Sequence, residues 1–448
     1  MWRFRFIHAL WCLATILLSY RLQRRLSRLL PRAAWVERRW ARVHAANAWR
    51  LKSACLRLRG VYIKLGQVLS VMGTFLPDDY TRELETLQDA VPPRPWRVIR
   101  RALTKSLGRP PWALFAAFAR KPVAAASLAQ VHEATLADGR RVAVKVLYPN
   151  IAAVMKLDMK VLELGVRMAQ RMLPIAQLQR VLDQLRELLE RETDLGHEAA
   201  CLRRMSAVMA DDPDVIVPEV VASLSNRSVL TMTFMSGAKI TDRAGLDERG
   251  LDPAAVATKL VQVFFRTVFR ERFFHADPHP GNFFVQRGER GQVRLVMLDL
   301  GSATPLRTNI ADGLAAVIEG CIRRDEARFL TGIDLMGFVA PSGDRGFLAA
   351  VLRSYFERIL TLEIKDFSNV PKSEAAKLDI GLSDADVPRV MRALEYPLGW
   401  FYLERAILMV YGVVARLAPE LNLVQIGLPY VAGLLGGRQA PSPAVAHA

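Results

Sequence analysis

The octet HADPHPGN, from His275 to Asn282, constrains the fold of this chain more than any other segment. It places Asp277 and Asn282 five residues apart, with two prolines and a glycine between them. Because proline fixes φ and lacks an amide hydrogen, this stretch cannot continue a helix or a central strand. The apolar run VQVFFRTVFRERFF before it fits a buried helix, and NFFVQ after it fits a short strand. The sequence therefore predicts a rigid loop between a helix and a strand.

A further acidic residue, Asp299, lies seventeen residues after Asn282, where the predicted strand VRLVMLDLG stops at Gly301. An Asp, then an Asn five residues on, and later an Asp-X-Gly is the arrangement with which protein kinases hold nucleotide-bound metal. We therefore expect Asn282 and Asp299 to bind Mg²⁺ or Mn²⁺, and Asp277 to orient or deprotonate the acceptor.

A lysine, Lys145, lies near the middle of the apolar run RVAVKVL, which reads as a strand from Arg141 to Leu147. A charged residue inside such a strand costs free energy unless it is paired. In a kinase the equivalent lysine bonds the α- and β-phosphates of ATP or ADP and a helix glutamate. Glu198, in a helix expected over residues 176–209, is the predicted partner of Lys145.

Each of these patterns also has an alternative interpretation. A lysine in VAVKV can face water at a strand edge, and DLG is a common ending of a strand. His275, Asp277 and His279 form an H-X-D-X-H cluster that could hold the divalent metal of a hydrolase. A metallohydrolase would leave Lys145 and the Asp277–Asn282 spacing unexplained.

The segment before the lysine strand occupies the place of a kinase's glycine-rich phosphate loop, yet it contains no GxGxxG. Its residues include Ala125, Ala126 and Ser127, whose amides and hydroxyl could still cradle phosphate. Alanine, however, cannot adopt every glycine conformation. Asp138-Gly139 predicts a hairpin turn into the lysine strand.

Size and charge narrow the function classes. With 448 residues, 51% of them apolar, the chain can form one large bilobal domain with extensions. Its formal charge of +18 suggests an anionic partner, such as phosphate or an acidic membrane surface. Because no zinc-finger spacing or RNA-binding signature is present, we expect no nucleic-acid partner. The four scattered cysteines predict no disulfide framework.

The N-terminal run from Phe6 to Tyr20 is nearly all apolar, and ten Arg or Lys follow between Arg21 and Lys52. Fifteen helical residues span roughly 22 Å, which is shorter than a hydrocarbon core of about 30 Å. A signal peptide, a short or tilted anchor, an interfacial amphipathic helix and a helix packed on the main domain all remain open. We expect membrane association through this segment, on the cytoplasmic side of an inner membrane.

Eight motifs together are similar to those of the aarF/UbiB family of atypical kinase-like proteins, over about residues 54–422. They are KLGQ (64–67), LQDAVPP (87–93), AAAS (124–127), VAVKV with Lys145, E-T-D (192–194), HEAA, HADPHPGN and DLG. The alanine loop in place of a glycine loop is itself a mark of this family. The family is tied to ubiquinone and other isoprenoid-lipid metabolism, and a bacterial source is expected.

The resemblance implies an α+β, bilobal protein-kinase-like fold with a helical N-terminal extension and a mostly helical C-terminal lobe. The KxGQ helix of the extension would lie over the active site, exclude a protein substrate, and favour ATP hydrolysis or a small lipid-like substrate. The sequence predicts a helix through residues 45–72, in which Gly66 suggests close approach of another backbone. Lys64 and Gln67 of this helix would face the nucleotide near Glu192 and Asp194. Expected partners are a membrane surface, an isoprenoid or quinone-like lipid, and enzymes of lipid biosynthesis.

The expected domains are a membrane-associating segment (1–40), the helical extension (41–110), the N-lobe (111–236), the C-lobe (237–435) and a disordered tail (436–448). The chain departs from the family pattern at two places. Cys201 stands where many members have an asparagine. The C-terminal segment LVQIGLPYVAGLLGG, broken by Pro429 and glycines, does not predict the pair of transmembrane helices found in bacterial ubiquinone members.

Overall fold

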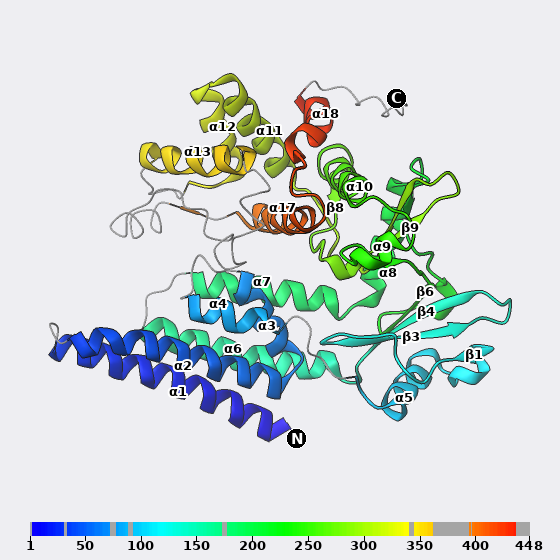
Figure 1. Cartoon of the computed structure of the whole chain (residues 1–448). Coiled ribbons are helices and arrows are strands. Elements are labelled where there is room, and N and C mark those ends of the chain that lie inside the picture. The colour runs from blue at the N-terminus through cyan, green and yellow to red at the C-terminus, as the bar shows by residue number, and fades with distance from the viewer. Residues whose placement is uncertain are drawn as a thin grey trace. The chain divides into compact units, whose positions relative to one another are not determined.

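A computed structural model describes residues 2–30, 34–71, 78–87, 93–172, 177–339, 345–361, 394–395 and 397–435 (Figure 1). These residues divide into two compact units. The first comprises Met1–Ala200 and Glu219–Phe234, and the second comprises Cys201–Pro218 and the described residues from Met235 onward. The expected tail, residues 436–448, lies outside the described residues.

The first unit combines long helices with one antiparallel sheet, whose strand order is β1-β3-β4-β6, with β2 also paired to β3. Its elements are α1 (Trp2–Leu29), α2 (Ala34–Leu58), α3 (Val61–Val71), α4 (Asp78–Glu85), α5 (Trp96–Leu107), β1 (Ala117–Phe118), β2 (Ala124–Ala125), β3 (Ala129–Thr135), β4 (Arg141–Leu147), α6 (Ile151–Met172), α7 (Gln177–Glu192), the start of α8 (Leu195–Val208) and β6 (Val229–Thr233).

The alternation of side chains along β4 determines which face of the sheet carries chemistry. Val142, Val144 and Val146 are buried with Ile99 and Leu103 of α5 in one apolar cluster. Because successive side chains of a strand point to opposite faces, Lys145 projects from the other face. The predicted turn at Asp138-Gly139 joins β3 to β4, and Gly139 has a φ of 85° that favours glycine.

Two long helices expected in the first unit are each interrupted. The helix predicted through residues 45–72 breaks at Arg59 and Gly60, whose φ values of 55° and 58° are left-handed. The helix predicted over residues 176–209 breaks at Asp194, whose carboxylate accepts a hydrogen bond from Gly196 N at 2.9 Å and so favours a new helix start. These two predictions were wrong because local capping interrupts the apolar periodicity.

The N-terminal helix α1 packs along α2 and α6 (Figure 1). Arg5 forms an ion pair of 2.5 Å with Asp158 of α6, whose side chain is 2% exposed. Asn47 of α2 donates to Ser19 Oγ at 2.7 Å, and Gln23 donates to Val36 O at 2.7 Å. The inner face of α1 is therefore fixed by polar contacts along its length. By length and composition alone, residues 5–29 could also span a membrane.

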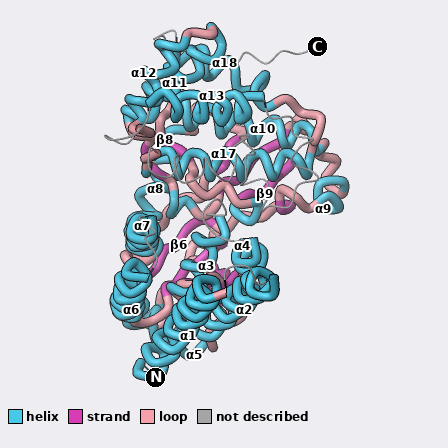
Figure 2. The backbone as a smooth tube through the Cα atoms, turned by 90° about the vertical axis from the view of Figure 1, so that its left-hand side faces the viewer, coloured by secondary structure: helices cyan, strands magenta, loops and turns pink. Residues whose placement is uncertain are grey.

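The second unit has a four-stranded sheet of order β5-β10-β9-β7 and a two-stranded sheet of β11 and β8. Helices α11, α12 and α13 pack together (Figure 2). Its elements are β5 (Val215–Ile216), β7 (Ala238–Lys239), α9 (Arg243–Asp247), α10 (Pro253–Phe265), β8 (Phe273–Phe274), β9 (Phe283–Arg287), β10 (Val293–Met297), β11 (Thr304–Pro305), α11 (Thr308–Arg323), α12 (Glu326–Met336), α13 (Arg345–Thr361), α17 (Leu398–Leu417) and α18 (Leu423–Leu435).

The run before the octet is helical for only part of its length. Helix α10 begins with Pro253 after Asp252, whose carboxylate accepts from Ala254 N and Ala255 N. It passes into a π-helical turn at Arg266–Arg270, and Phe273–Phe274 forms β8. The C-terminal segment expected to be broken by Pro429 instead forms the continuous helix α18 with Pro429 inside it.

Candidate functional site

Lys145 and Glu198 form a buried ion pair within the first unit. Lys145 Nζ lies 2.9 Å from Glu198 Oε1 and 2.8 Å from Oε2, so both carboxylate oxygens accept hydrogen bonds. The two side chains are only 13% and 4% exposed. A desolvated pair of this kind is costly unless its geometry is good, and it is seldom retained for stability alone. The pair therefore marks the face of the sheet that carries Lys145 as a candidate functional surface.

The alanine segment forms a tight hairpin beside the lysine strand. Ala124 and Ala125 pair with β3, and Ala126 N donates to Ala129 O at 2.8 Å across the turn. Tyr148 OH donates to Ala126 O at 3.2 Å. None of residues 124–129, all of which are described, has a positive φ. The turn therefore does not need glycine, and alanine can occupy these positions.

The KxGQ helix is joined to the E-T-D segment through one ion pair. Lys64 Nζ contacts Glu192 Oε1, with side chains 12% and 24% exposed. Asp194 instead pairs with Arg227 at 2.9 Å. The side chain of Gln67 lies outside the described residues. Gly66 permits the approach of a side chain rather than a backbone, because a Cβ there would lie 2.3 Å from Leu87 Cδ1.

The octet forms a loop that is held by its own backbone, in the second unit. Asp277 O accepts hydrogen bonds from His279 N at 2.7 Å and from Asn282 Nδ2 at 3.0 Å. Residues Pro280–Asn282 form a 3₁₀ turn, and Leu298 N donates to Asn282 O at 2.8 Å. These bonds tie the loop to the end of β10 and fix the orientation of both Asp277 and Asn282.

The two histidines of the octet have structural contacts. His275 is 2% exposed, and its Nδ1 accepts from Asp277 N at 3.3 Å. Burial lowers the pKa of His275, which favours the neutral ring. His279 Nδ1 accepts from Gly281 N at 3.1 Å. Among the described residues no group of three or more His, Cys, Asp or Glu could hold a metal.

Asp299 and Asn282 offer oxygen donors of the kind that Mg²⁺ takes together with substrate phosphates. Asp299 is exposed and has a left-handed backbone with φ 49° and ψ 60°, directly before the 3₁₀ turn at Leu300–Ser302. Since Asn282 uses its amide nitrogen on Asp277 O, its side-chain oxygen is the atom that could bind a cation. Cys201 contacts Ala303 O at 3.6 Å, next to this segment.

Arg405 is a residue of this site that sequence reasoning missed. Its Nη2 donates to Asp277 Oδ1 at 2.8 Å, and the side chains of Arg405 and Asp277 are 14% and 24% exposed. The contact joins residues 128 positions apart. The only sequence signal for Arg405 was an arginine within the apolar run at residues 398–417. Such a residue needs a partner, but the sequence does not identify which carboxylate pairs with it.

The strand lysine, its helix glutamate, the Asp/Asn loop and the Asp-X-Gly define the class of kinase-like proteins. Residues 86–331 match the family model described as ABC1 atypical kinase-like domain. The chain belongs to this family, and the resemblance proposed from its motifs is confirmed.

Several known proteins are similar to this chain. A probable protein kinase UbiB of Marinobacter nauticus is 31% identical over 402 residues, covering 88% of this chain and 71% of that protein. The AarF domain-containing protein kinase 1 of Gallus gallus is 32% identical over 262 residues, covering 58% of this chain and 50% of that protein. The solved structure of the Rv3197–erythromycin complex from Mycobacterium tuberculosis has a TM-score of 0.59 and 26% identity, covering 89% and 99% of the two chains. The predicted α+β kinase-like fold is thereby confirmed.

Proposed function

We propose that this protein binds ATP or ADP with Mg²⁺ or Mn²⁺ and transfers phosphate to water or to a small molecule. The process it supports is ubiquinone or other isoprenoid-lipid biosynthesis at a membrane. The buried Lys145–Glu198 pair carries the proposal, because it holds an ammonium group where a kinase needs one for the α- and β-phosphates. Membership of the atypical kinase family supports it.

Each site residue has a role in this proposal. Glu198 orients Lys145, and the hairpin amides of Ala125 and Ala126 with Ser127 cover the phosphates. Asn282 and Asp299 hold the metal, which would supply charge stabilisation for the phosphates. Lys64 and Gln67, with Glu192 and Asp194 as accessory groups, line the nucleotide site.

Asp277 orients the acceptor hydroxyl or water, and it can take a proton at its carboxylate. The loop contacts of its backbone favour a fixed carboxylate position. Because Lys145 and Asp299 belong to different compact units, the proposal requires both to serve one nucleotide.

Thermal stabilisation by nucleotide tests the proposal. A ligand at 100 times its Kd should add about 2.7 kcal/mol of stability. We expect Mg-ATP to raise the Tm of the wild type, and Asp299→Asn to lose this shift while keeping the Tm of the free protein. Asp334→Asn, a change in helix α12 of the same unit, serves as the matched control. If Mg-ATP raised the Tm of Asp299→Asn as much as that of the wild type, Asp299 would not be a metal ligand.

A nucleotide-gated scaffold without useful turnover is the second candidate function. The observation that favours it is the Arg405–Asp277 ion pair, because a guanidinium on the candidate base competes with the acceptor. For a scaffold held inactive in this way, Arg405→Gln should raise basal ATP hydrolysis several-fold with the nucleotide Kd unchanged. A fall in hydrolysis to the level of Asp277→Asn would instead make Arg405 part of the productive geometry.

We also propose that α1 lies on a membrane surface rather than across it. Its inner face is fixed to α2 and α6 by the Arg5–Asp158 pair and by Ser19 and Gln23. Its outer face exposes Ile7, Trp11, Leu18 and Leu22 at helical spacing, each at least 49% exposed. An exposed apolar stripe flanked by arginines is typical of helices that lie in the plane of an anionic interface.

A further inference from the structure

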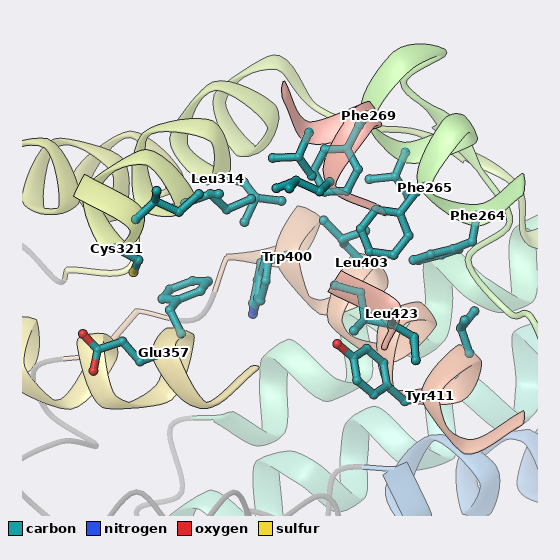
Figure 3. Close-up of a pocket in the computed structure, with 18 residues that line it drawn as sticks. Phe264, Phe265, Phe269, Leu314, Cys321, Glu357, Trp400, Leu403, Tyr411 and Leu423 are labelled. Carbon is teal, nitrogen blue, oxygen red and sulfur yellow. The ribbon is translucent and has the colours of Figure 1, made fainter. Parts of the chain in front are cut away.

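A cavity of about 330 Å³ lies within the helices of the second unit (Figure 3). Its wall is aromatic and aliphatic. The side chains that shape it include Phe264, Phe265, Phe269, Leu314, Trp400 and Leu403. These residues come from α10 with its π-helical turn, α11 and α17. None of them belongs to the candidate nucleotide site.

Features of α18 and of the turn after α10 shape the wall of this cavity. Gly427 of α18 faces the ring of Phe265, and a Cβ there would lie 2.0 Å from Phe265 Cε1. The π-helical turn after α10 supplies Val268 and Phe269 to the wall. Such turns often mark functional sites. Trp400 is fixed because its Nε1 donates to Tyr355 OH at 3.1 Å.

The size and the chemistry of the wall indicate a ligand. Protein interiors are close-packed, and their ordinary voids are little larger than a water molecule. Ligand sites typically measure about 300–1,000 Å³ and are mostly apolar. An apolar cavity does not hold water well, but it binds hydrocarbons. Two apolar side chains at this cavity, Ile322 and Leu428, are 61% and 49% exposed, which gives it an opening to solvent.

One end of the cavity is polar. Cys321 and Glu357 lie there, away from Phe264 at the other end (Figure 3). The pKa of the Cys321 thiol is raised by burial and further by the charge of Glu357, while Arg353 lowers it. Glu357 places a carboxylate at this end of the cavity. This end therefore suits a polar group that can donate a hydrogen bond to the carboxylate.

We propose that this cavity binds the hydrocarbon chain of a single-chain lipid with a hydroxyl-bearing head that donates to Glu357. The chain lies along Phe265, Phe269 and Trp400, and the head lies beside Cys321 and Glu357. Helix α17 also carries Arg405, the partner of Asp277, so it borders both this cavity and the candidate base. The proposal does not depend on nucleotide binding.

Quenching of tryptophan fluorescence by 12-bromo-1-dodecanol, used below its aggregation limit, tests this site in the full chain. Among the eight tryptophans, Trp400 lines the cavity. We expect saturable quenching that is lost in Trp400→Phe. It should persist in Trp112→Phe, which changes a tryptophan that is 67% exposed in the first unit. Quenching that rises linearly without saturation, or that remains in Trp400→Phe, would overturn the proposal.

A filled cavity gives a second readout that needs no change at Trp400. In Leu314→Phe/Val410→Phe, two added rings should occupy the cavity and weaken binding of the bromoalcohol at least tenfold, with the Tm maintained. Ile407→Phe replaces this pair if the double variant does not fold. Equal affinity in a folded, filled variant would place the probe elsewhere and reject the site. Because neither readout uses nucleotide, failure here leaves the nucleotide proposal untouched.

Discussion

At the scale of single residues, two buried ionic groups have consequences for stability that can be measured. Lys145 and Glu198 neutralise each other, so removal of either leaves a charge without its main partner in a desolvated place. Glu404 is the second group. It accepts a hydrogen bond from Tyr355 OH, which in turn accepts one from Trp400 Nε1.

Removal of Lys145 alone should cost more stability than removal of the pair. We expect Lys145→Met to lower the free energy of unfolding by about 3 kcal/mol, because Glu198 remains buried without its ammonium partner. Lys145→Met/Glu198→Leu should recover much of this loss, since no buried charge remains. Urea unfolding of the wild type, Lys145→Met, Glu198→Leu and the double variant measures the coupling. Additive losses would mean that the pair contributes no interaction energy.

The stability of the protein should depend on pH through Glu404. Burial raises the pKa of Glu404 from 4.5 to about 7, although the hydrogen bond from Tyr355 opposes this. The folded protein therefore keeps a proton that the unfolded chain releases at intermediate pH. The stabilisation is complete below about pH 4.5 and is lost as the pH rises through about 7. In Glu404→Gln the decrease in stability between pH 5 and 8 should be smaller than in the wild type. Parallel curves would contradict the assignment.

At the scale of elements, helix α1 shows that tertiary contacts are needed to interpret an apolar run. Residues 6–20 left an anchor, an interfacial helix and a packed helix all open, and the structure shows a helix that continues to Leu29 and packs on α2 and α6. Buried polar contacts such as Arg5–Asp158 would have to be broken for α1 to leave the unit. The exposed side of α1 keeps its apolar stripe.

Binding to anionic vesicles should depend on that stripe. Full burial of an apolar side chain contributes about 1.5–3 kcal/mol, so Trp11→Ser/Leu18→Ser should weaken binding at least tenfold. Trp112→Ser is the matched control, since it removes an equally exposed tryptophan outside α1. Co-sedimentation with anionic and with zwitterionic vesicles measures the effect. Binding should also weaken with added salt, because arginines contribute to it. Unchanged sedimentation of the double variant would remove α1 from the interface.

At the scale of the whole molecule, the residues proposed to bind nucleotide and metal are divided between the two compact units. Lys145 and Glu198 lie in the first unit, and Asp277, Asn282 and Asp299 lie in the second. The proposed function therefore predicts that one nucleotide orders both groups of residues.

Hydrogen exchange can test this requirement. On addition of Mg-ATP we expect slower amide exchange both in residues 124–147 and in residues 277–301. Asp299→Asn should reduce the protection in both segments, because one ligand links them. Protection confined to the first segment, and insensitive to Asp299→Asn, would show that the second unit takes no part in binding.

Much of the fold and of the candidate site could be predicted because the signals are local. The period of two in RVAVKVL, the prolines of the octet and the Asp-Gly turn act over a few residues, and they correctly indicated β4, the loop at residues 277–282 and the β3–β4 hairpin. The predicted single helix over residues 176–209 was wrong, because the cap at Asp194 interrupts a run whose hydrophobic periodicity is helical.

The sequence by itself determined the kinase-like family, the polar loop and the strand lysine, since short motifs specify them. The tertiary structure alone decided that Arg405 meets Asp277, that α1 is held by Asp158, and that the helices of the second unit enclose a cavity. Such contacts join residues more than a hundred positions apart. Which residues meet in such contacts depends on how whole helices and strands pack. Neither the hydrophobic periodicity nor the turn and capping signals of the sequence specify that packing.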